Sequence, residues 1–242
     1  MNGIIDFHSH ILPGIDDGSA SAEESVAMLR EASAQGISHV IATPHFYARY
    51  DDPDVFLEAR KQAEEQLRLE LEVHPGLPEI TVGTEVHFFP GISHSDILEG
   101  LTIGKNRCIL IEMPDSPWSE SMYRELENIS LRRDLIPVVA HVDRYISPFR
   151  TYGIPERLAE LPVLVQANAS FFLRAGTRSL ALKLLRQDKI HLLGSDCHNM
   201  TTRPPVLGDA VKVIRQKLGE EPLDRIRYYQ RELLSEISTC NL

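Results

Sequence analysis

Seven short runs of consecutive apolar, largely β-branched residues recur along the chain, separated by longer stretches with helical periodicity. Consecutive apolar positions are typical of strands that are covered on both faces. The predicted strands span residues 3–7, 38–43, 79–86, 108–113, 136–141, 163–168 and 190–195. The pattern therefore indicates an α/β protein with a buried sheet.

Helices are predicted between and after these strands, and two of them carry clear start signals. Ser21 precedes the sequence AEES, and Pro53 opens a long amphipathic stretch. The predicted helices span residues 21–35, 53–72, 119–133, 155–160, 177–187, 205–218 and 221–237. This alternation predicts a parallel sheet, either open and doubly wound or closed as a barrel. A G-x-G-x-x-G turn, which would favour a dinucleotide-binding fold, does not follow the first strand.

Six of the seven predicted strands end in, or run into, a histidine or a carboxylate. These residues are His8, His10, Asp16, Asp17, His45, Glu85, Glu112, His141, Asp196 and His198. In a closed parallel barrel the C-terminal strand ends converge on one mouth, whereas an open sheet would spread them along an edge. We therefore predict a closed barrel of seven parallel strands, similar to a TIM barrel and formed as a single domain by residues 1–242.

The spacing of these side chains favours metal ions. In H-x-H and D-x-H the two side chains are at i and i+2, so on an extended strand they point the same way. Imidazole suits Zn, Mn and Fe, and carboxylates can bridge two ions. A single histidine after a strand is more often a surface or core residue than a ligand. The joint placement at one end of the sheet is what favours a site, and there are enough donors for two or three ions.

Composition narrows the functional class. The formal charge is −10 and no run of Lys and Arg is present, which argues against nucleic-acid binding. No signal peptide and no apolar run of about 20 residues is visible, so membrane insertion is not expected. The three cysteines, Cys108, Cys197 and Cys240, lack C-x-x-C spacing. The expected location is the cytoplasm, without disulfides.

The motifs DFHSHILPGIDDGS, TPH, GTEV, IEMP, AHVDRY and GSDCHNMTTRP together resemble the polymerase and histidinol phosphatase superfamily. More narrowly, the chain is similar to its bacterial metal-dependent protein-tyrosine phosphatases, which are encoded with capsule and exopolysaccharide operons. The resemblance runs from residue 6 to about residue 205. It implies a distorted (β/α)7 barrel that holds three divalent metals.

The resemblance also implies a role for each side chain. His8, His10, Glu85 and Asp196 correspond to a first metal site, and Glu85 bridges to a second site completed by Glu112 and His141. A third set is Asp17, His45 and His198, with Asp16 as a supporting group. Arg144 and Arg203 correspond to phosphate-contacting positions, which suits a guanidinium fork. The expected cofactors are two to three divalent ions, Mn²⁺ foremost, with Fe or Zn as alternatives.

A rival motif lies inside the same region. Cys197 to Arg203 satisfies C-x5-R, the spacing of cysteine-dependent phosphatases. The five intervening residues contain no glycine, and two prolines follow directly, so few backbone N–H groups are free to cradle a phosphate. If the segment after Ser195 is extended, Cys197 also points away from Asp196 and His198. A small apolar filler is the better interpretation of this cysteine.

The predicted function is hydrolysis of phosphotyrosine, on the tail of a bacterial tyrosine kinase that controls capsule synthesis. The alternatives are histidinol-phosphate phosphatase, a proofreading nuclease, and a kinase-binding regulator without turnover. Tyr47, Arg49 and Tyr50, in the loop after TPH, either line the approach to the site or are ordinary loop residues. His87, two residues after Glu85, is a further candidate to face the mouth.

Overall fold

The computed structural model describes residues 3–235 and contains a barrel of parallel strands. The strands are β1 (Asp6–Ser9), β2 (His39–Ala42), β3 (His45–Phe46), β4 (Glu79–Val82), β5 (Glu85–His87), β6 (Cys108–Glu112), β7 (Ile136–Val139), β8 (Leu164–Asn168) and β9 (Leu192–Gly194). They form one sheet in the order β1-β2-β4 and another in the order β3-β5-β6-β7-β8-β9, with every pairing parallel.

The two sheets combine into one ring. β3 follows β2 in the same direction, and β5 follows β4 in the same direction. Because β2 pairs with β4 and β3 pairs with β5, the two sheets are joined on this side. On the other side β1 meets β9, where Asp196 N–H donates to the His8 carbonyl at 2.8 Å and His10 N–H donates to the Cys197 carbonyl at 2.9 Å. The predicted distorted (β/α)7 barrel is thus confirmed, with seven strand positions, two of them interrupted.

A local feature accompanies each interruption. Between β4 and β5, Arg60 from the long helix donates to the carbonyl of Gly83 at 3.3 Å and to the Thr84 hydroxyl at 2.6 Å, so its guanidinium group occupies the gap between the two strands. Between β2 and β3 stands Pro44, which has no N–H to donate. The prediction of one continuous strand over residues 79–86 was wrong at this point, and β3 was not predicted as a separate strand.

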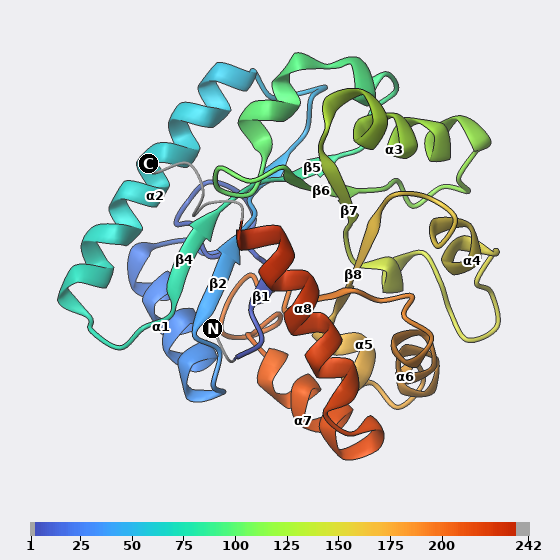
Figure 1. The fold of residues 1–242 in the computed structure, drawn as a ribbon. Helices are drawn as coiled ribbons and strands as arrows, with labels where there is room; N and C mark the ends of the chain where they lie inside the picture. Colours follow the sequence, from blue (N-terminus) through green and yellow to red (C-terminus); the bar gives the residue numbers. More distant parts are fainter. Residues whose placement is uncertain (1–2, 236–242) are drawn as a thin grey trace.

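Helices surround the ring (Figure 1). They are α1 (Ala22–Ala34), α2 (Pro53–Val73), α3 (Glu120–Arg133), α4 (Ile154–Leu158), α5 (Ala169–Leu173), α6 (Arg178–Arg186), α7 (Leu207–Leu218) and α8 (Glu221–Ser235), with short 3-10 turns at Ile92–His94, Asp96–Leu101 and Val142–Arg144. The Ser21 hydroxyl caps α1 by accepting from Glu24 N–H, and Pro53 opens α2 after the N-cap Asp52. α5 was not predicted, and the expected end of the last helix at residue 237 lies outside the described residues.

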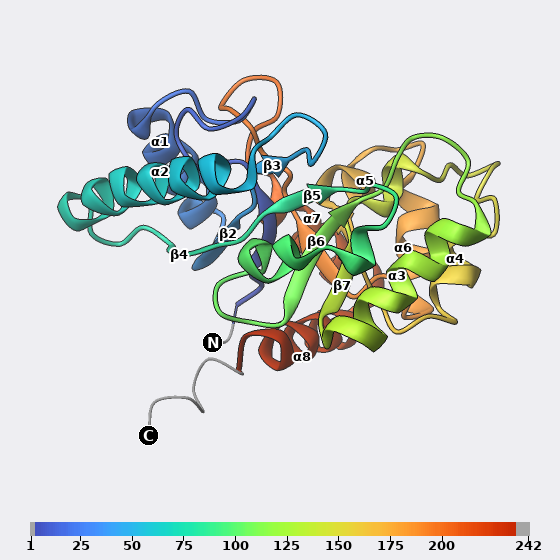
Figure 2. The same cartoon turned by 90° about the horizontal axis from the view of Figure 1, so that it is seen from above.

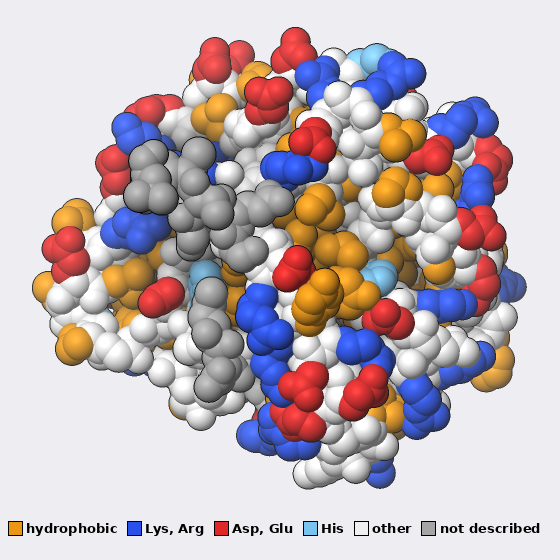
Figure 3. Space-filling model, in the orientation of Figure 1, with side chains coloured by type: hydrophobic (Ala, Val, Ile, Leu, Met, Phe, Trp, Pro, Cys, Tyr) orange, Lys and Arg blue, Asp and Glu red, His pale blue; other side chains and the backbone are white. Residues whose placement is uncertain are grey.

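The final helix closes one end of the barrel. Leu233 and Leu234 of α8 pack with Phe7, Ile41 and Leu110 in the cluster that fills the ring. Figure 2 shows α8 on one side of the barrel and the loops after β1, β3 and β9 on the other. Acidic and basic side chains are interspersed on the face that α8 covers (Figure 3). Among residues 3–235, no helix combines the length and apolar character that a membrane span requires.

Candidate metal centre

All nine predicted metal ligands gather at the mouth opposite α8. They come from β1 and the turn after it (His8, His10, Asp17), β3 (His45), β5 (Glu85), β6 (Glu112), the end of β7 (His141) and the segment after β9 (Asp196, His198). All except Asp17 have little exposed surface. Residues up to 190 positions apart in the chain therefore meet because parallel strands end together.

The first group surrounds one point with four donor atoms. Nε2 of His8 lies 3.1 Å from Nε2 of His10 and 3.2 Å from Oε2 of Glu85. Oδ1 of Asp196 lies 3.7 Å from His8 Nε2 and 3.6 Å from His10 Nε2. Two imidazoles and two carboxylates around one centre form a donor set suited to Mn, Fe or Zn.

Glu85 is shared with a second group. Its other oxygen, Oε1, lies 2.7 Å from Nε2 of His141, which is 3.5 Å from Oε1 of Glu112. His87, whose Nδ1 lies 3.1 Å from Oε2 of Glu112, also borders this group, as its sequence position indicated. The two oxygens of Glu85 thus face different groups, which is the arrangement that a bridging carboxylate requires.

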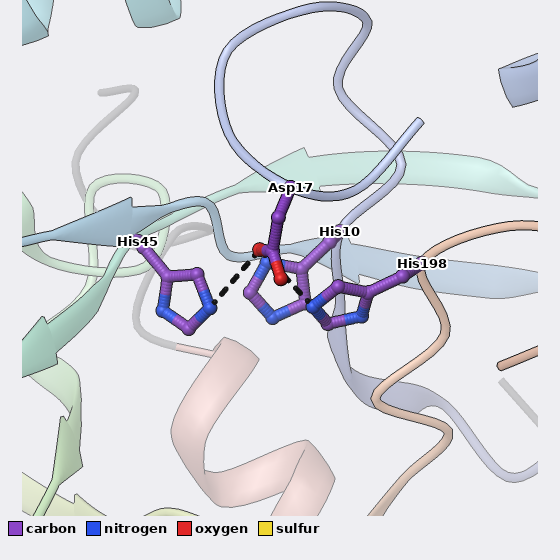
Figure 4. A group of neighbouring side chains, drawn as sticks. All are labelled: His10, Asp17, His45 and His198. Atoms are coloured by element: carbon purple, nitrogen blue, oxygen red, sulfur yellow. Dashed lines mark ion pairs between the residues drawn. The ribbon is translucent and has the colours of Figure 1, made fainter. Parts of the chain in front are cut away.

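The third group is drawn in Figure 4, where Asp17 projects between His45 and His198. Its Oδ1 lies 3.4 Å from Nε2 of each of these two histidines. His10 approaches the same group, and its ring lies 3.9 Å from that of His198, centre to centre. Asp17 is 66% exposed, so this group is the one closest to solvent.

The outer nitrogens of four histidines are fixed by neighbours. Nδ1 of His8 faces the Gln166 side-chain oxygen at 3.2 Å, and Nδ1 of His10 faces Asp16 at 2.7 Å. In His198 the same atom faces the Asp196 carbonyl at 3.1 Å, and in His141 it faces the Tyr145 hydroxyl at 3.3 Å. The oxygens of Gln166, Asp16 and Asp196 can only accept, so in His8, His10 and His198 they favour the tautomer whose Nε2 lone pair points into the centre, as metal ligation requires.

Three buried atoms in the centre make no well-aligned hydrogen bond within the described part of the chain, although each lies within ion-pair distance of a neighbour. They are Oε2 of Glu85, Nδ1 of His45 and Nε2 of His198. Oε2 of Glu85 lies 2.9 Å from Nδ1 of His45, and Nε2 of His198 lies 3.4 Å from Oδ1 of Asp17, so these donor atoms face one another and divalent cations between them would satisfy all three. The residues present therefore fit the metals that the sequence indicates.

The pKa values of the clustered side chains also indicate that the carboxylates need positive charge beside them. Burial alone would lower the pKa of His10, but hydrogen bonds to Asp16 and Glu85 raise it to about 10. Burial likewise opposes the charged form of Glu112, yet His141 and His87 lower its pKa to about 2. Without metals, protons on histidines compensate the carboxylates, and bound cations would take over that role.

Two arginines cover the centre. Arg144 donates to Oε1 of Glu112 at 2.8 Å and to Oδ2 of Asp196 at 3.1 Å, and Arg203 donates to Oδ1 of Asp196 at 2.6 Å. Their side chains are 35% and 36% exposed. Both guanidinium groups, predicted as phosphate contacts, therefore lie between the carboxylates and the solvent.

Supporting residues on β8 were missed by the sequence analysis. Gln166 accepts from His141 N–H at 2.6 Å and contacts His8, while Asn168 donates to Oδ2 of Asp196 at 2.8 Å. Asp6, also missed, accepts from Ser195 N–H at 2.7 Å and so ties β1 to β9. The available signal was two polar residues at i and i+2 in an otherwise apolar buried strand, because such groups need partners.

The backbone is unusual at two of the ligands. His141 has φ +30° and Asp196 has φ +53°, in the left-handed region that non-glycine residues rarely adopt. At Gly194 an added Cβ would lie 2.5 Å from Cβ of His8, so only glycine lets β9 approach the first ligand. The assumption of an extended segment after Ser195 was therefore wrong at Asp196.

Cys197 nevertheless points away from the centre. It is 2% exposed, belongs to the hydrophobic core, and burial raises the pKa of its thiol. The backbone N–H groups of Thr201, Thr202 and Arg203 all donate to Oδ1 of Asn199, so they are not directed at a phosphate. The C-x5-R spacing does not form a cysteine phosphatase loop here. Cys108 is also buried and free, and Cys240 lies outside the described residues.

The loop after β3 divides into two parts. The Tyr47 ring lies 5.4 Å from that of His45 and 5.3 Å from that of His87, centre to centre, so Tyr47 lines the site. Burial and the nearby Glu112 raise the pKa of Tyr47 to about 12, which keeps the phenol neutral. Arg49 instead stacks over Tyr50, and the Tyr50 side chain is 76% exposed.

Comparison with known proteins was made on both sequence and fold. The family model described as capsular polysaccharide synthesis, CpsB/CapC, matches residues 4–234. The tyrosine-protein phosphatase YwqE of Bacillus subtilis is 31% identical over 235 residues, covering 90% of this chain and 86% of YwqE. The tyrosine-protein phosphatase CpsB of Streptococcus agalactiae serotype III is 27% identical, covering 92% and 94%.

Solved structures give the same picture. A chain from the crystal structures of YwqE from Bacillus subtilis and CpsB from Streptococcus pneumoniae, described as unique metal-dependent tyrosine phosphatases, superposes with a TM-score of 0.83. It is 25% identical, and the match covers 96% of this chain and 94% of the other. N-isopropylammelide isopropylaminohydrolase from Burkholderia multivorans, at 13% identity and a TM-score of 0.54, shares the fold, with 93% and 71% covered.

Proposed function

Because the chain belongs to the CpsB/CapC capsular polysaccharide synthesis family, we propose that it is a metal-dependent protein-tyrosine phosphatase. The observation that carries the proposal is the convergence of three donor groups at one barrel mouth, with Glu85 shared and two arginines above them. Two further arguments are the similarity to YwqE and CpsB over most of the chain and the burial of Cys197.

We infer that His8, His10, Glu85 and Asp196 hold one ion, that Glu85, Glu112 and His141 hold a second, and that Asp17, His45 and His198 hold a third. Mn²⁺ is the ion we expect from the family resemblance, with Fe or Zn as alternatives, because the mixed imidazole and carboxylate donor set suits all three. When bound, the ions would neutralise phosphate charge and lower the pKa of the attacking water.

Arg144 and Arg203 would bind the phosphate. In the structure both guanidinium groups contact Asp196, and Arg144 also contacts Glu112. Cations between these carboxylates would take over the charge compensation, so the arginine N–H groups could turn to phosphate oxygens in a bidentate manner. Gln166, Asp16 and Tyr145 would keep the histidine rings in their orientation.

Phosphotyrosine suits such a site because its leaving group is a phenol. A phenol has a pKa of about 10, well below that of an alkyl alcohol, and so needs less protonation as the bond to phosphorus breaks. The expected substrate is a phosphotyrosine protein, and we propose the tail of a bacterial tyrosine kinase in capsule synthesis. A cytoplasmic location would bring enzyme and tail together.

The test is hydrolysis of a phosphotyrosine peptide by protein loaded with Mn²⁺, repeated after chelation and with the Cys197→Ser variant. We expect activity to be lost on chelation and retained within about twofold in Cys197→Ser. Glu85→Gln should lower kcat/KM at least about a hundredfold, since it removes a charge from two sites. Hydrolysis that survives chelation and disappears with Cys197→Ser would overturn the metal mechanism.

A further inference from the structure

A cavity of about 280 Å³ opens beside the metal centre and holds a third arginine. Its lining includes Arg144, Arg203 and Asp196, together with Ser170, Thr202 and Arg174. The first three residues belong to the centre described above. Arg174 belongs to none of the donor groups and was not singled out by any sequence motif.

The position of Arg174 is fixed by its backbone. It follows α5, which begins directly after Asn168, a side chain that contacts Asp196. The N–H of Arg174 donates to the Ser170 carbonyl at 3.1 Å, and its carbonyl accepts from Arg178 N–H at 2.9 Å. Phe171 and Phe172 anchor α5 in the core. The side chain therefore starts from a rigid point at the rim of the mouth.

The guanidinium group of Arg174 is unpaired among the described residues. Within residues 3–235 it has no hydrogen-bond or ion-pair partner, and the residue is exposed. By contrast, Arg178, four residues on, donates to the carbonyls of Phe172 and Leu173 at the end of α5. The helix end is thus stabilised by Arg178, and Arg174 is left free to face a ligand.

The two carboxylates of the cavity already have partners. Asp196 is bound by Arg144 and Arg203, and Asp143 accepts from Asn168 N–H at 2.8 Å. Ser170 and Thr202 add hydroxyl groups to the lining. A free guanidinium beside hydroxyl donors, at the edge of a phosphate site, is the chemistry that recognises a carboxylate.

We propose that Arg174 is a specificity-determining residue that binds an acidic side chain close to the phosphotyrosine of the substrate. The inference rests on the proposed phosphatase function and narrows its substrate class to phosphotyrosine segments with a neighbouring Asp or Glu. The acidic residue would lie within about three positions of the phosphotyrosine, a span that an extended peptide and an arginine side chain can cover.

The experiment uses Mn²⁺-loaded protein and neutral phosphotyrosine peptides in which a single Glu, or Gln as its match, occupies each position in turn. At one position we expect Glu to lower KM about 2- to 5-fold relative to Gln, with kcat unchanged and the difference shrinking at high salt. Arg174→Gln should abolish this difference, and Arg174→Glu should reverse it in favour of a Lys peptide. Binding of a non-hydrolysable phosphonate peptide, followed by fluorescence anisotropy, should show the same preferences.

The matched control is Arg186→Gln, because Arg186 is an exposed arginine of α6 that does not line the cavity. It should behave as the parent protein. Equal use of Glu and Gln peptides at every position would overturn the proposal. A loss of kcat on p-nitrophenyl phosphate in Arg174→Gln would also overturn it, since Arg174 would then contact the phosphate itself. Failure of the proposed phosphatase function would give a different result, because no phosphotyrosine peptide would then be hydrolysed in a metal-dependent way. The proposal for Arg174 would be wrong in that case too.

Discussion

Histidines are used in two different ways in this molecule. At the mouth, Nδ1 of His8, His10 and His198 faces an oxygen acceptor and Nε2 points into the metal centre. His191 has the opposite arrangement, since its Nδ1 accepts from Val165 N–H at 3.0 Å and its ring packs edge-on against Tyr229. A proton on that nitrogen would break the hydrogen bond, so His191 stabilises the fold only in its neutral form.

The free energy of unfolding should therefore fall at mildly acidic pH. Burial lowers the pKa of His191, partly opposed by Asp188, whereas in the unfolded chain a histidine has a pKa of about 6.5. Below about pH 6.5 the unfolded state binds a proton that the folded state does not bind. The free energy of unfolding then falls by at most about 1.4 kcal/mol per pH unit. Urea unfolding at pH 7 and pH 5 should show a smaller loss in His191→Gln than in the parent. The other histidines titrate in both proteins and cancel, so equal losses would contradict this account.

At the scale of the elements, a few contacts attach the final helix, α8, to the start of the barrel. In α8 the side chain of Gln230, which is 1% exposed, forms hydrogen bonds with both backbone groups of Ile5. Ile5 N–H donates to Oε1 of Gln230 at 3.1 Å, and Nε2 of Gln230 donates to the Ile5 carbonyl at 2.9 Å. This pair of hydrogen bonds fixes the closing helix to the segment that leads into β1.

Replacing Gln230 with Leu should lower the free energy of unfolding by about 2–4 kcal/mol, because two buried backbone groups of Ile5 lose their partners. Urea denaturation followed by circular dichroism measures the change. The control Gln216→Leu alters an exposed position of α7 and should stay within about 0.5 kcal/mol of the parent. Similar stability in both variants would show that α8 is held by its leucines alone.

At the scale of the whole molecule, the metal centre links nearly the entire ring. Its donors come from every strand position except β8, and β8 contributes the supporting Gln166 and Asn168. Buried carboxylates converge there, and among the described residues protonated histidines and two arginines compensate them. Bound cations would stabilise the folded state, because the unfolded chain cannot assemble these donors.

Saturating Mn²⁺ should accordingly raise Tm by about 5–10 °C, the shift expected for ligand at about a hundred times its Kd in a chain of this size. Chelation should reverse the shift, and the prediction of a single domain requires one unfolding transition. Differential scanning fluorimetry is sufficient for the measurement. Glu85→Gln should largely lose the response, whereas Glu156→Gln, at a remote exposed ion pair with Lys189, should keep it. An equal shift in Glu85→Gln would place the binding elsewhere.

The sequence by itself determined the alternation of strands and helices and the position of the nine donors at strand ends, because apolar periodicity and H-x-H spacing are local properties. Only the tertiary structure decided which donors share a centre and that Gln166 and Asn168 support it. It also decided that Arg60 contacts the gap between β4 and β5 and that Arg174 remains free beside the proposed phosphate site. These features depend on side chains far apart in sequence, whose distances exist only once the ring has closed.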